Sequence, residues 1–339
     1  MRNHEVVTAH RLLDEKGALI EPGWSRSLVQ IYDRNDIKKR KTRIKEWDYY
    51  YVMSHSNKIA LCFTISDLSY LGMASVSIVN LENATEHTDS IIVPFTMGKT
   101  NLPPTSAVGD VKFKNKKLAM EFLNKGDYRV LRVDYPEFDG GKGLRVNVKL
   151  TDEPQDSMVI ATPWAEDKKA FYYNQKIDCL RASGKIEYDG QLIALDRELD
   201  FAGLDWGRGV WTYDNVWYWG SGQVDGVPFG FNIGYGFGDT SAASENVIFY
   251  DGVAHKFDDI VFNISDNFTD PWTFKSSDGR FDMDFVPIIE KNALVDAKII
   301  VTDQHQVFGK MSGTAVLDDG RKIQLKDFLC FAEKVHNKY

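Results

Sequence analysis

The chain has 339 residues, of which 43% are hydrophobic and 27% are charged, and its formal net charge at pH 7 is −8. This composition is typical of a globular protein that folds in water, and the length allows about two domains of ordinary size. The acidic balance, interrupted by a single basic run at residues 38–43, disfavours nucleic acid as a partner.

Targeting and covalent features are few. The N-terminal residues lack the apolar stretch of a signal peptide, and no run of the sequence is apolar enough to span a bilayer, so we expect a cytoplasmic protein with no integral membrane segment. Cys62, Cys179 and Cys330 are far apart and odd in number, which predicts no disulfide framework.

Runs of aromatic and β-branched residues recur along the first half, separated by short polar or glycine-containing segments. Such runs predict β-strands joined as hairpins. The expected pairs are residues 47–54 with 59–66, 74–80 with 90–95, 111–113 with 118–122, and 128–133 with 144–150. Amphipathic helices are nearly missing, and the best candidate, residues 166–173, is short.

The second half is punctuated by Asp-Gly pairs, which are favoured in type I′ hairpin turns. They are Asp189-Gly190, Asp225-Gly226, Asp251-Gly252, Asp278-Gly279 and Asp319-Gly320. Consecutive hairpins with few helices favour an all-β fold of antiparallel meanders closed into barrels or sandwiches. At this length we predict two antiparallel β-barrels in tandem, with one domain over residues 1–180 and the second over residues 181–339.

Aromatic side chains concentrate in residues 201–250, which hold half of the eight tryptophans: Trp206, Trp211, Trp217 and Trp219. Large rings beside glycines and a few charged groups are what an apolar ligand pocket requires. The same rings are also typical of a β-rich core. Both interpretations stay open for these residues, although the charged groups among them favour a site.

The sequence lacks the common cofactor motifs. No GxxxxGK[ST] string is present, and the glycines of residues 234–238 have the wrong spacing for a dinucleotide loop. No GxSxG elbow occurs, and no pair of the seven histidines has zinc-ligand spacing. We therefore predict neither a metal nor another cofactor.

The first candidate site is Asp205-Trp206-Gly207-Arg208-Gly209, where an acid and a guanidinium are three residues apart. The two groups could pair structurally, with the guanidinium stacked on a Trp ring. Alternatively, Arg208 fixes a substrate oxygen while Asp205 orients the substrate or moves a proton.

The second candidate is the polar segment 238–246, where Asp239 and Glu245 could face one cavity. Two neighbouring carboxyls in an apolar setting raise the pKa of one of them and create a general acid. The alternative is that residues 239–241 form only an Asx or Ser/Thr turn.

Further candidates are weaker. His305 lies among polar residues at the edge of an apolar strand, where an imidazole could act as an acid or base or have a structural role. Trp164 and the segment 171–176 are near the junction of the halves and could line a pocket or belong to the core. The remaining predicted ligand contacts are Tyr172, Asn174, Tyr213, Asn232, Tyr235, Ser241, Asn246 and Gln306.

Five long strings, DWGRGVW, GFNIGYGFGDTSAASENVIFYDG, DPWTFKSSDGRFDMDF, HQVFGKMSGTAVLDDG and FAEKVHN, resemble the bacterial family called domain of unknown function 2804. The resemblance is strongest over residues 172–337 and includes LLDEKGALIEPGW in the N-terminal half. This family implies little about chemistry.

More distantly, the sequence is similar to the tandem lipocalin-like superfamily, which includes AttH-like proteins, carotenoid 1,2-hydratases, lipid-linked fungal survival factors and some Diels–Alderases. That similarity implies two calycin-like barrels, a ligand site in or between them, and an apolar small-molecule ligand. No residue role is carried over from it.

Three functions are consistent with these features. The first is a cofactor-independent enzyme that hydrates, isomerises or cyclises an apolar oxygenated molecule such as an isoprenoid or lipid. Asp205 or Glu245 would donate the proton, Arg208 and His305 would orient the reacting groups, and Trp faces would stabilise positive charge. The second is a non-catalytic carrier of such a molecule. Glycan binding or cleavage is the third, because Trp faces also stack on sugars and paired carboxyls hydrolyse glycosides.

Overall fold

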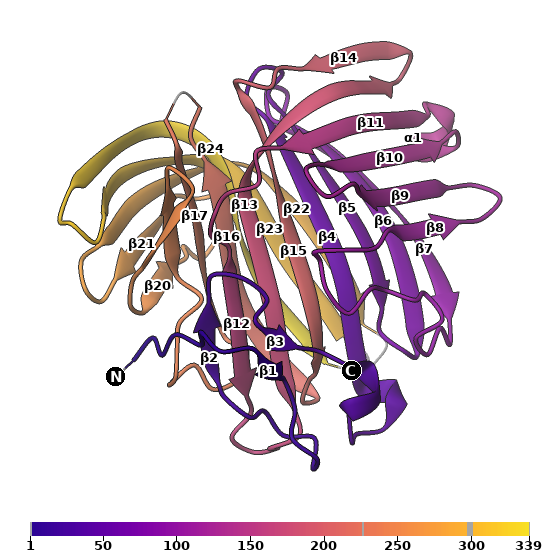
Figure 1. Cartoon of the computed structure of the whole chain (residues 1–339). Helices are drawn as coiled ribbons and strands as arrows, with labels where there is room; N and C mark the ends of the chain where they lie inside the picture. The colour runs from indigo at the N-terminus through magenta and orange to yellow at the C-terminus, as the bar shows by residue number, and fades with distance from the viewer. Residues whose placement is uncertain (1, 226, 297–300, 339) are drawn as a thin grey trace.

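The computed structural model describes residues 2–225, 227–296 and 301–338. Nearly all regular structure in these residues is β, in two large antiparallel sheets that curve as half-barrels (Figure 1). This confirms the prediction of an all-β fold with two lipocalin-like units in tandem. No helix among these residues is long and apolar enough to cross a membrane.

The first sheet has 13 strands. Its main path runs through β7 (Thr85–Pro94), β6 (Leu71–Asn80), β5 (Ile59–Asp67), β4 (Ile44–Ser54), β15 (Asp200–Val210), β13 (Phe171–Tyr188), β11 (Leu144–Thr151), β10 (Arg129–Tyr135), β9 (Ala119–Asn124) and β8 (Val111–Lys114). Beside this path, β12 (Met158–Pro163) and β14 (Gln191–Leu195) pair with β13, and β2 (Gly23–Ser25) pairs with β12.

The second sheet has nine strands. Their order is β19 (Val253–Lys256), β18 (Val247–Tyr250), β17 (Phe229–Tyr235), β16 (Asp214–Gln223), β24 (Lys322–Lys338), β23 (Val301–Val316), β22 (Phe281–Asp296), β21 (Trp272–Ser276) and β20 (Ile260–Asn263). The small elements are a parallel pair, β1 (His10–Arg11) with β3 (Gln30–Ile31), and the short helices η1 (Arg34–Asp36), η2 (Lys41–Arg43) and α1 (Phe138–Gly141).

The four hairpins predicted in the first half are all present, as β4–β5, β6–β7, β8–β9 and β10–β11. Residues 166–173, the best helix candidate of the sequence, do not form a helix. Residues 171–173 begin β13, whose backbone groups pair with both β12 and β15. Two ladders of hydrogen bonds satisfy these residues better than one short helix would.

The Asp-Gly turns divide into two kinds. In Asp189-Gly190 and Asp251-Gly252 both residues have positive φ, as a type I′ turn requires. In the pairs at residues 278–279 and 319–320 only the glycine has positive φ, so the type I′ prediction is wrong there. The fifth pair includes Gly226, which lies outside the described residues.

The chain passes from the first sheet to the second between Val210 and Asp214. The predicted boundary at residue 180 falls inside β13, a strand of the first sheet. That the chain consists of two folding domains stays a prediction. If it does, the sheet topology favours a boundary at residues 211–213.

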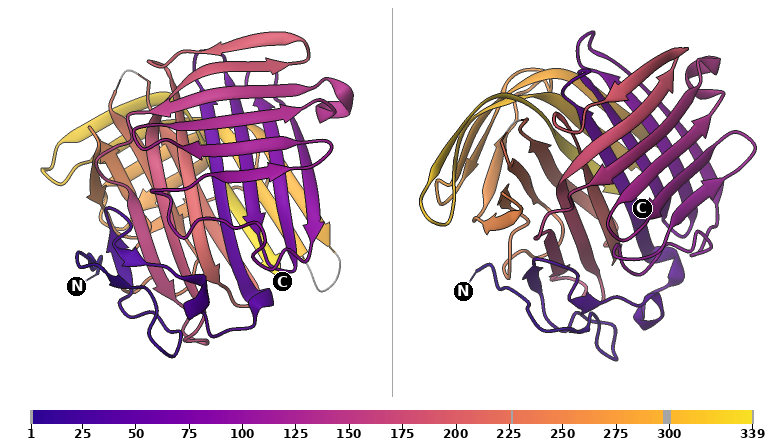
Figure 2. Two further views of the ribbon diagram at one scale, coloured as in Figure 1. Left: turned by 45° about the vertical axis from the view of Figure 1, so that its right-hand side comes forward. Right: turned by 45° about the horizontal axis from the view of Figure 1, so that its top comes forward.

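The two sheets lie against each other, with β13 in contact with β16 and β17 (Figures 1 and 2). Each sheet encloses its own apolar core on its inner face. Two further apolar clusters fill the contact between the sheets. Because side chains alternate along a strand, β4, β13, β15 and β16 each present one face to their own core and the other to this contact. The candidate site lies in the contact.

Candidate functional site

Polar side chains collect on the faces that the two sheets turn toward each other. In β13, Asn174, Lys176 and Asp178 alternate with Tyr173, Gln175 and Ile177, of which Tyr173 and Ile177 belong to the first core. Asp205 lies opposite Lys176 on the neighbouring strand β15. Buried polar groups are costly in free energy unless each has a hydrogen-bonding or charged partner. The partners of these side chains therefore determine their protonation and their possible chemistry.

The carboxylate of Asp205 is held by three side chains of the first sheet. Lys176 Nζ lies 2.7 Å from Oδ2, while Asn174 Nδ2 and Trp47 Nε1 donate to Oδ1 at 2.6 Å and 3.1 Å. The Lys176 ammonium also lies 3.9 Å from the ring centre of Trp219, which belongs to the second sheet. The ion pair lies within the first sheet, and the contact of Lys176 with Trp219 joins it to the second sheet.

Glu245 approaches this ion pair from the loop between β17 and β18 and is only 3% exposed. The pKa of its carboxyl is raised to about 7, chiefly by burial. Lys176, Lys256 and a hydrogen bond from Tyr172 oppose this shift, and the negative charge of Asp205 acts in the same direction as burial. Near neutral pH this carboxyl exchanges a proton readily, which is the property of a general acid.

A third carboxyl, Glu333 on β24, is buried in the same contact and accepts hydrogen bonds from side chains of its own sheet. Trp217 Nε1 donates to its Oε1 at 3.2 Å, and Gln304 and Gln306 each donate to its Oε2 at 3.3 Å. Burial raises the pKa of Glu333. Gln306 also donates to the hydroxyl of Tyr49 on β4, at 3.2 Å, so this carboxyl too is tied to both sheets.

Asp178 is the fourth carboxyl. Its Oδ1 accepts from Tyr51 and Ser221, both at 2.8 Å, and Gln223 Nε2 donates to the Tyr51 hydroxyl at 2.6 Å. Burial raises the pKa of Asp178 to about 6, against the opposing effects of the two hydroxyls and of Lys176. Ser221 and Gln223 come from β16 and Tyr51 from β4, so this group again bridges the sheets.

We call these four carboxyls and the lysine between them the buried acid cluster, whose members are Lys176, Asp178, Asp205, Glu245 and Glu333. Burial raises the pKa values of Asp178, Glu245 and Glu333, and the ammonium groups of Lys176, Lys256 and Lys291 only partly oppose this effect. These carboxyls therefore hold protons at higher pH than exposed carboxyls do. The cluster can therefore both donate and accept protons.

An aromatic layer lies beside the cluster. Its rings are Trp47, Tyr172, Trp211, Trp217 and Phe237, which contact one another at centroid distances of 4.2 to 6.1 Å. Trp47 and Trp217 donate to Asp205 and Glu333, so these two indoles connect the layer directly to the acids.

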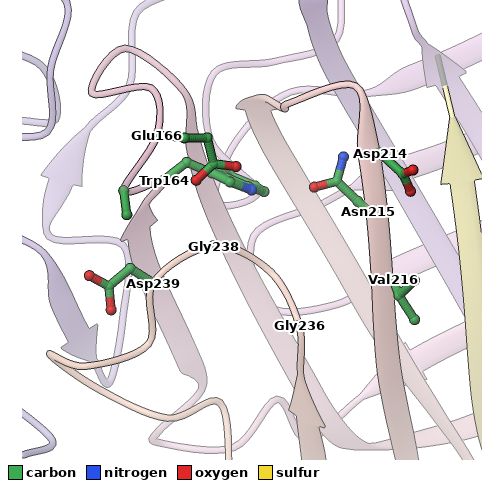
Figure 3. A pocket seen from close by; sticks show the side chains of 9 residues that line it. Trp164, Glu166, Asp214, Asn215, Val216, Gly236, Gly238 and Asp239 are labelled. Atoms are coloured by element: carbon green, nitrogen blue, oxygen red, sulfur yellow. The ribbon is translucent and has the colours of Figure 1, made fainter.

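A surface depression of about 230 Å³ opens above this layer (Figure 3). Trp164 and Glu166 lie on one side of it, Asp214, Asn215 and Val216 on the other, and the loop of Gly236, Gly238 and Asp239 below. Phe237 of the aromatic layer lies between the two glycines of this loop, which places the depression directly outside the layer.

The structure brings many of the residues predicted from the sequence into this region. Asp205 and Glu245 belong to the acid cluster. Around it lie Tyr172, Asn174, Trp211, Trp217, Trp219, Asn232 and Gln306, with Trp164 at the depression.

Arg208 does not meet Asp205. It is fully buried inside the first half-barrel, where it pairs with Asp48 at 3.0 Å and stacks on Trp206. Residues three apart on a strand point to opposite faces, which is why the sequence spacing did not bring the two groups together. Trp206 is likewise a residue of the first core.

Asp239 and Glu245 do not face one cavity either. Asp239 is exposed at the depression, and its Oδ1 accepts from the backbone of Ser241, which is the Asx turn given as the alternative. Asn246 is buried and bonds to the backbone of Gly234 and Asp258, which fixes the loop that carries Glu245.

His305 points away from the acid cluster. Its neighbours Gln304 and Gln306 reach Glu333, so the alternation of β23 turns the imidazole to the other face. There it stacks on Phe268 and contacts Glu290. Tyr235 stacks on Tyr218 beside the second core, and Tyr213 is exposed.

Sequence reasoning included Lys176 only within the candidate segment 171–176, and it missed Asp178 and Glu333 in the cluster and Tyr51 and Trp47 beside it. A signal existed in β13, where the polar residues Asn174, Lys176 and Asp178 recur at every second position. Glu333 gave no such signal, because it stands singly in a strand at the end of the chain. Among the described residues, no group of three or more His, Cys, Asp and Glu side chains is arranged to hold a metal ion.

Several solved structures share this fold. A protein described as AttH from Nitrosomonas europaea is 12% identical, with 91% of this chain and 98% of that chain covered and a TM-score of 0.59. CghA in complex with Sch210972 is 10% identical, with 96% and 97% covered and a TM-score of 0.55. Kievitone hydratase from Nectria haematococca is 11% identical, with 97% and 98% covered and a TM-score of 0.51.

At these identities the similarity shows the fold, which is the tandem lipocalin-like fold expected from the sequence. No curated protein matches the chain significantly. A family model, by contrast, matches residues 3–339, which is almost the whole sequence. The chain belongs to the family described as domain of unknown function DUF2804.

Proposed function

We propose that this protein binds an apolar, oxygenated small molecule between its two sheets and transforms it by acid catalysis without a cofactor. Glu245 is the proton donor in this proposal, and Asp205 is the carboxylate that accepts a proton or stabilises developing positive charge. Hydration, isomerisation and cyclisation of an isoprenoid or other lipid all fit this division of roles.

The observation that carries the proposal is the buried pair of unlike carboxyls. Glu245 has a pKa raised to about 7, whereas Asp205 is paired with Lys176 at 2.7 Å. When one carboxyl of a pair is protonated and the other is ion-paired, the first can act as the acid and the second as the base. In a hydration, Glu245 would give its proton to an alkene carbon, and the water that adds to the resulting cation would lose a proton to Asp205.

The surroundings favour a cationic transition state on an apolar molecule. Trp47 and Trp217 each donate an N–H to a carboxyl of the cluster, and their rings belong to the aromatic layer. The face of a Trp ring attracts positive charge, and this attraction is stronger where water is excluded. The names of two proteins with this fold, kievitone hydratase and CghA with Sch210972 bound, associate the fold with a hydration and with a small organic ligand.

The experiment begins with extraction of the purified protein and mass spectrometry of co-purifying small molecules. The ligand found is then incubated with the wild type and with the Glu245→Gln and Asp205→Asn variants. We expect binding by all three proteins and a loss of turnover of about 100-fold or more in the Glu245→Gln variant. Asp282→Asn, at an exposed position of β22, is the matched control.

The outcomes separate the alternatives. Turnover that persists in both variants would contradict the roles given to the two carboxyls. Binding without turnover by any form would identify a carrier. A sugar as the only bound species would overturn both and favour the glycan function.

A further inference from the structure

Three buried side-chain oxygens in the contact between the sheets have no hydrogen-bond partner among the described residues. They are Asn174 Oδ1, Asp178 Oδ2 and Gln223 Oε1, and their residues are 0%, 1% and 0% exposed. All three are acceptors on the faces that β13 and β16 turn toward the contact.

The chemistry of the neighbouring groups fixes which atoms are left over. The Tyr51 hydroxyl gives its single proton to Asp178 Oδ1, so Gln223 must present its amide nitrogen to Tyr51, which leaves the amide oxygen unused. Asn174 uses its nitrogen on two acceptors, Asp205 Oδ1 and the Trp206 carbonyl, so its oxygen is likewise left over.

Asp178 Oδ2 and Gln223 Oε1 belong to residues that both bond the Tyr51 hydroxyl, so the two unused acceptors are close to one centre. Two donors of this region are already committed. The Ser221 hydroxyl bonds Asp178 and Tyr51, and the Lys176 ammonium pairs with Asp205. A buried acceptor without a donor is costly, so a group that binds here gains by supplying one.

We propose that the ligand carries a hydroxyl or ammonium group on its apolar body and donates this group's hydrogen to Asp178 and Gln223. The inference rests on the proposed function and specifies the polar group of its ligand. Molecules that end in a carboxylate are excluded from the same position, because they would bring acceptors and negative charge against Asp178.

The test uses four probes of similar size that differ in one group: 2-phenylethanol, 2-phenylethylamine, 3-phenylpropanoate and propylbenzene. Binding of each to the purified protein is measured by calorimetry at pH 7.5, above the pKa of Asp178 of about 6. We expect the alcohol, the amine or both to bind at least about tenfold more tightly than propylbenzene, and the carboxylate to bind least.

Two variants locate the effect. Asp178→Asn converts the unused acceptor into a donor, and Gln223→Met removes the second acceptor at similar length. Each should reduce the preference for the alcohol or amine to less than about threefold. Binding of propylbenzene should be retained, which shows that the variant is folded. The exposed control Asp282→Asn should keep the preference of the wild type.

Each outcome decides a separate question. A preference for the alcohol alone identifies a hydroxyl as the polar group of the ligand, and a preference for the amine alone identifies an ammonium. Equal binding of all four probes, or tight binding of the carboxylate, overturns the inference and leaves the proposed function standing. Failure of all four probes to bind contradicts the apolar site itself and therefore the proposed function.

Discussion

Asp205 and Arg208 lie three residues apart on one strand, yet their side chains enter different compartments. Asp205 joins Lys176 in the contact between the sheets, and Arg208 joins Asp48 inside the first half-barrel. The same short motif thus contributes one residue to the candidate site and one to the core. This separation assigns Arg208 a structural role.

Replacing Arg208 with Met should destabilise the protein by about 3–5 kcal/mol, because Asp48 would be left as a buried charge without its partner. Adding Asp48→Asn should recover part of that loss. Urea unfolding measures both effects, with Arg132→Met on the exposed face of β10 as a control expected to change stability by less than about 0.5 kcal/mol. A loss no larger than that of the control would contradict the core role.

The ion pair of Lys176 with Asp205 predicts a second effect on stability. Lys176→Met should cost about 3–5 kcal/mol, since it leaves the Asp205 carboxylate buried and unbalanced. The double variant with Asp205→Asn should be more stable than Lys176→Met alone. A double-mutant cycle in urea checks this, and strictly additive losses would show that the two side chains do not interact.

The close packing of Trp47 against Gly207 leads to a prediction about substitution at this glycine. A Cβ atom at this position would lie 1.9 Å from the indole of Trp47, whose N–H donates to Asp205. Gly207→Ala should therefore displace the ring and cost about 1–3 kcal/mol or more. Near-UV circular dichroism reports the ring. Gly220→Ala, where the nearest atom would be 3.1 Å away, should leave the spectrum nearly unchanged.

Glu245 predicts how stability depends on pH. Its pKa rises from 4.5 to about 7 on folding, so between these values the folded state binds more protons than the unfolded state. The contribution of this carboxyl is therefore most favourable below about pH 4.5 and declines as pH rises through 7.

The Glu245→Gln variant lacks this decline. Its stability relative to the wild type should increase by a few kcal/mol between pH 5 and pH 8, as measured by urea unfolding at several pH values. A difference between the two proteins that stays constant with pH would show that Glu245 is not a proton-holding group.

The fold was largely predictable because local signals agreed with it. Aromatic and β-branched runs and their separating turns gave the hairpins of the first half, and these pair as expected. The turns at residues 278–279 and 319–320 adopt other geometries, since an Asp-Gly pair is compatible with more than one turn. The helix candidate at residues 166–173 does not form, because residues 171–173 join a strand that pairs with two neighbours and residues 166–170 form a turn.

The site was predictable only in part. Asp205, Glu245 and Asn174 could be named from composition, but their partners Lys176 and Glu333 come from strands whose pairing is not local. Strand alternation alone, applied to residues 205 and 208, would have separated Asp205 from Arg208. What the sequence does not encode locally is which two sheet faces meet, and that contact creates the acid cluster.

The proposed acid catalysis depends most on a protonated Glu245 in the contact between the sheets. Its pKa can be measured by following the side-chain carboxyl carbons of glutamate by ¹³C NMR from pH 4 to pH 9, with the Glu245→Gln variant to assign the resonance. We predict a titration near pH 7, as the buried position requires. Titration near the ordinary glutamate value of about 4.3 would contradict the role of Glu245 as the proton donor.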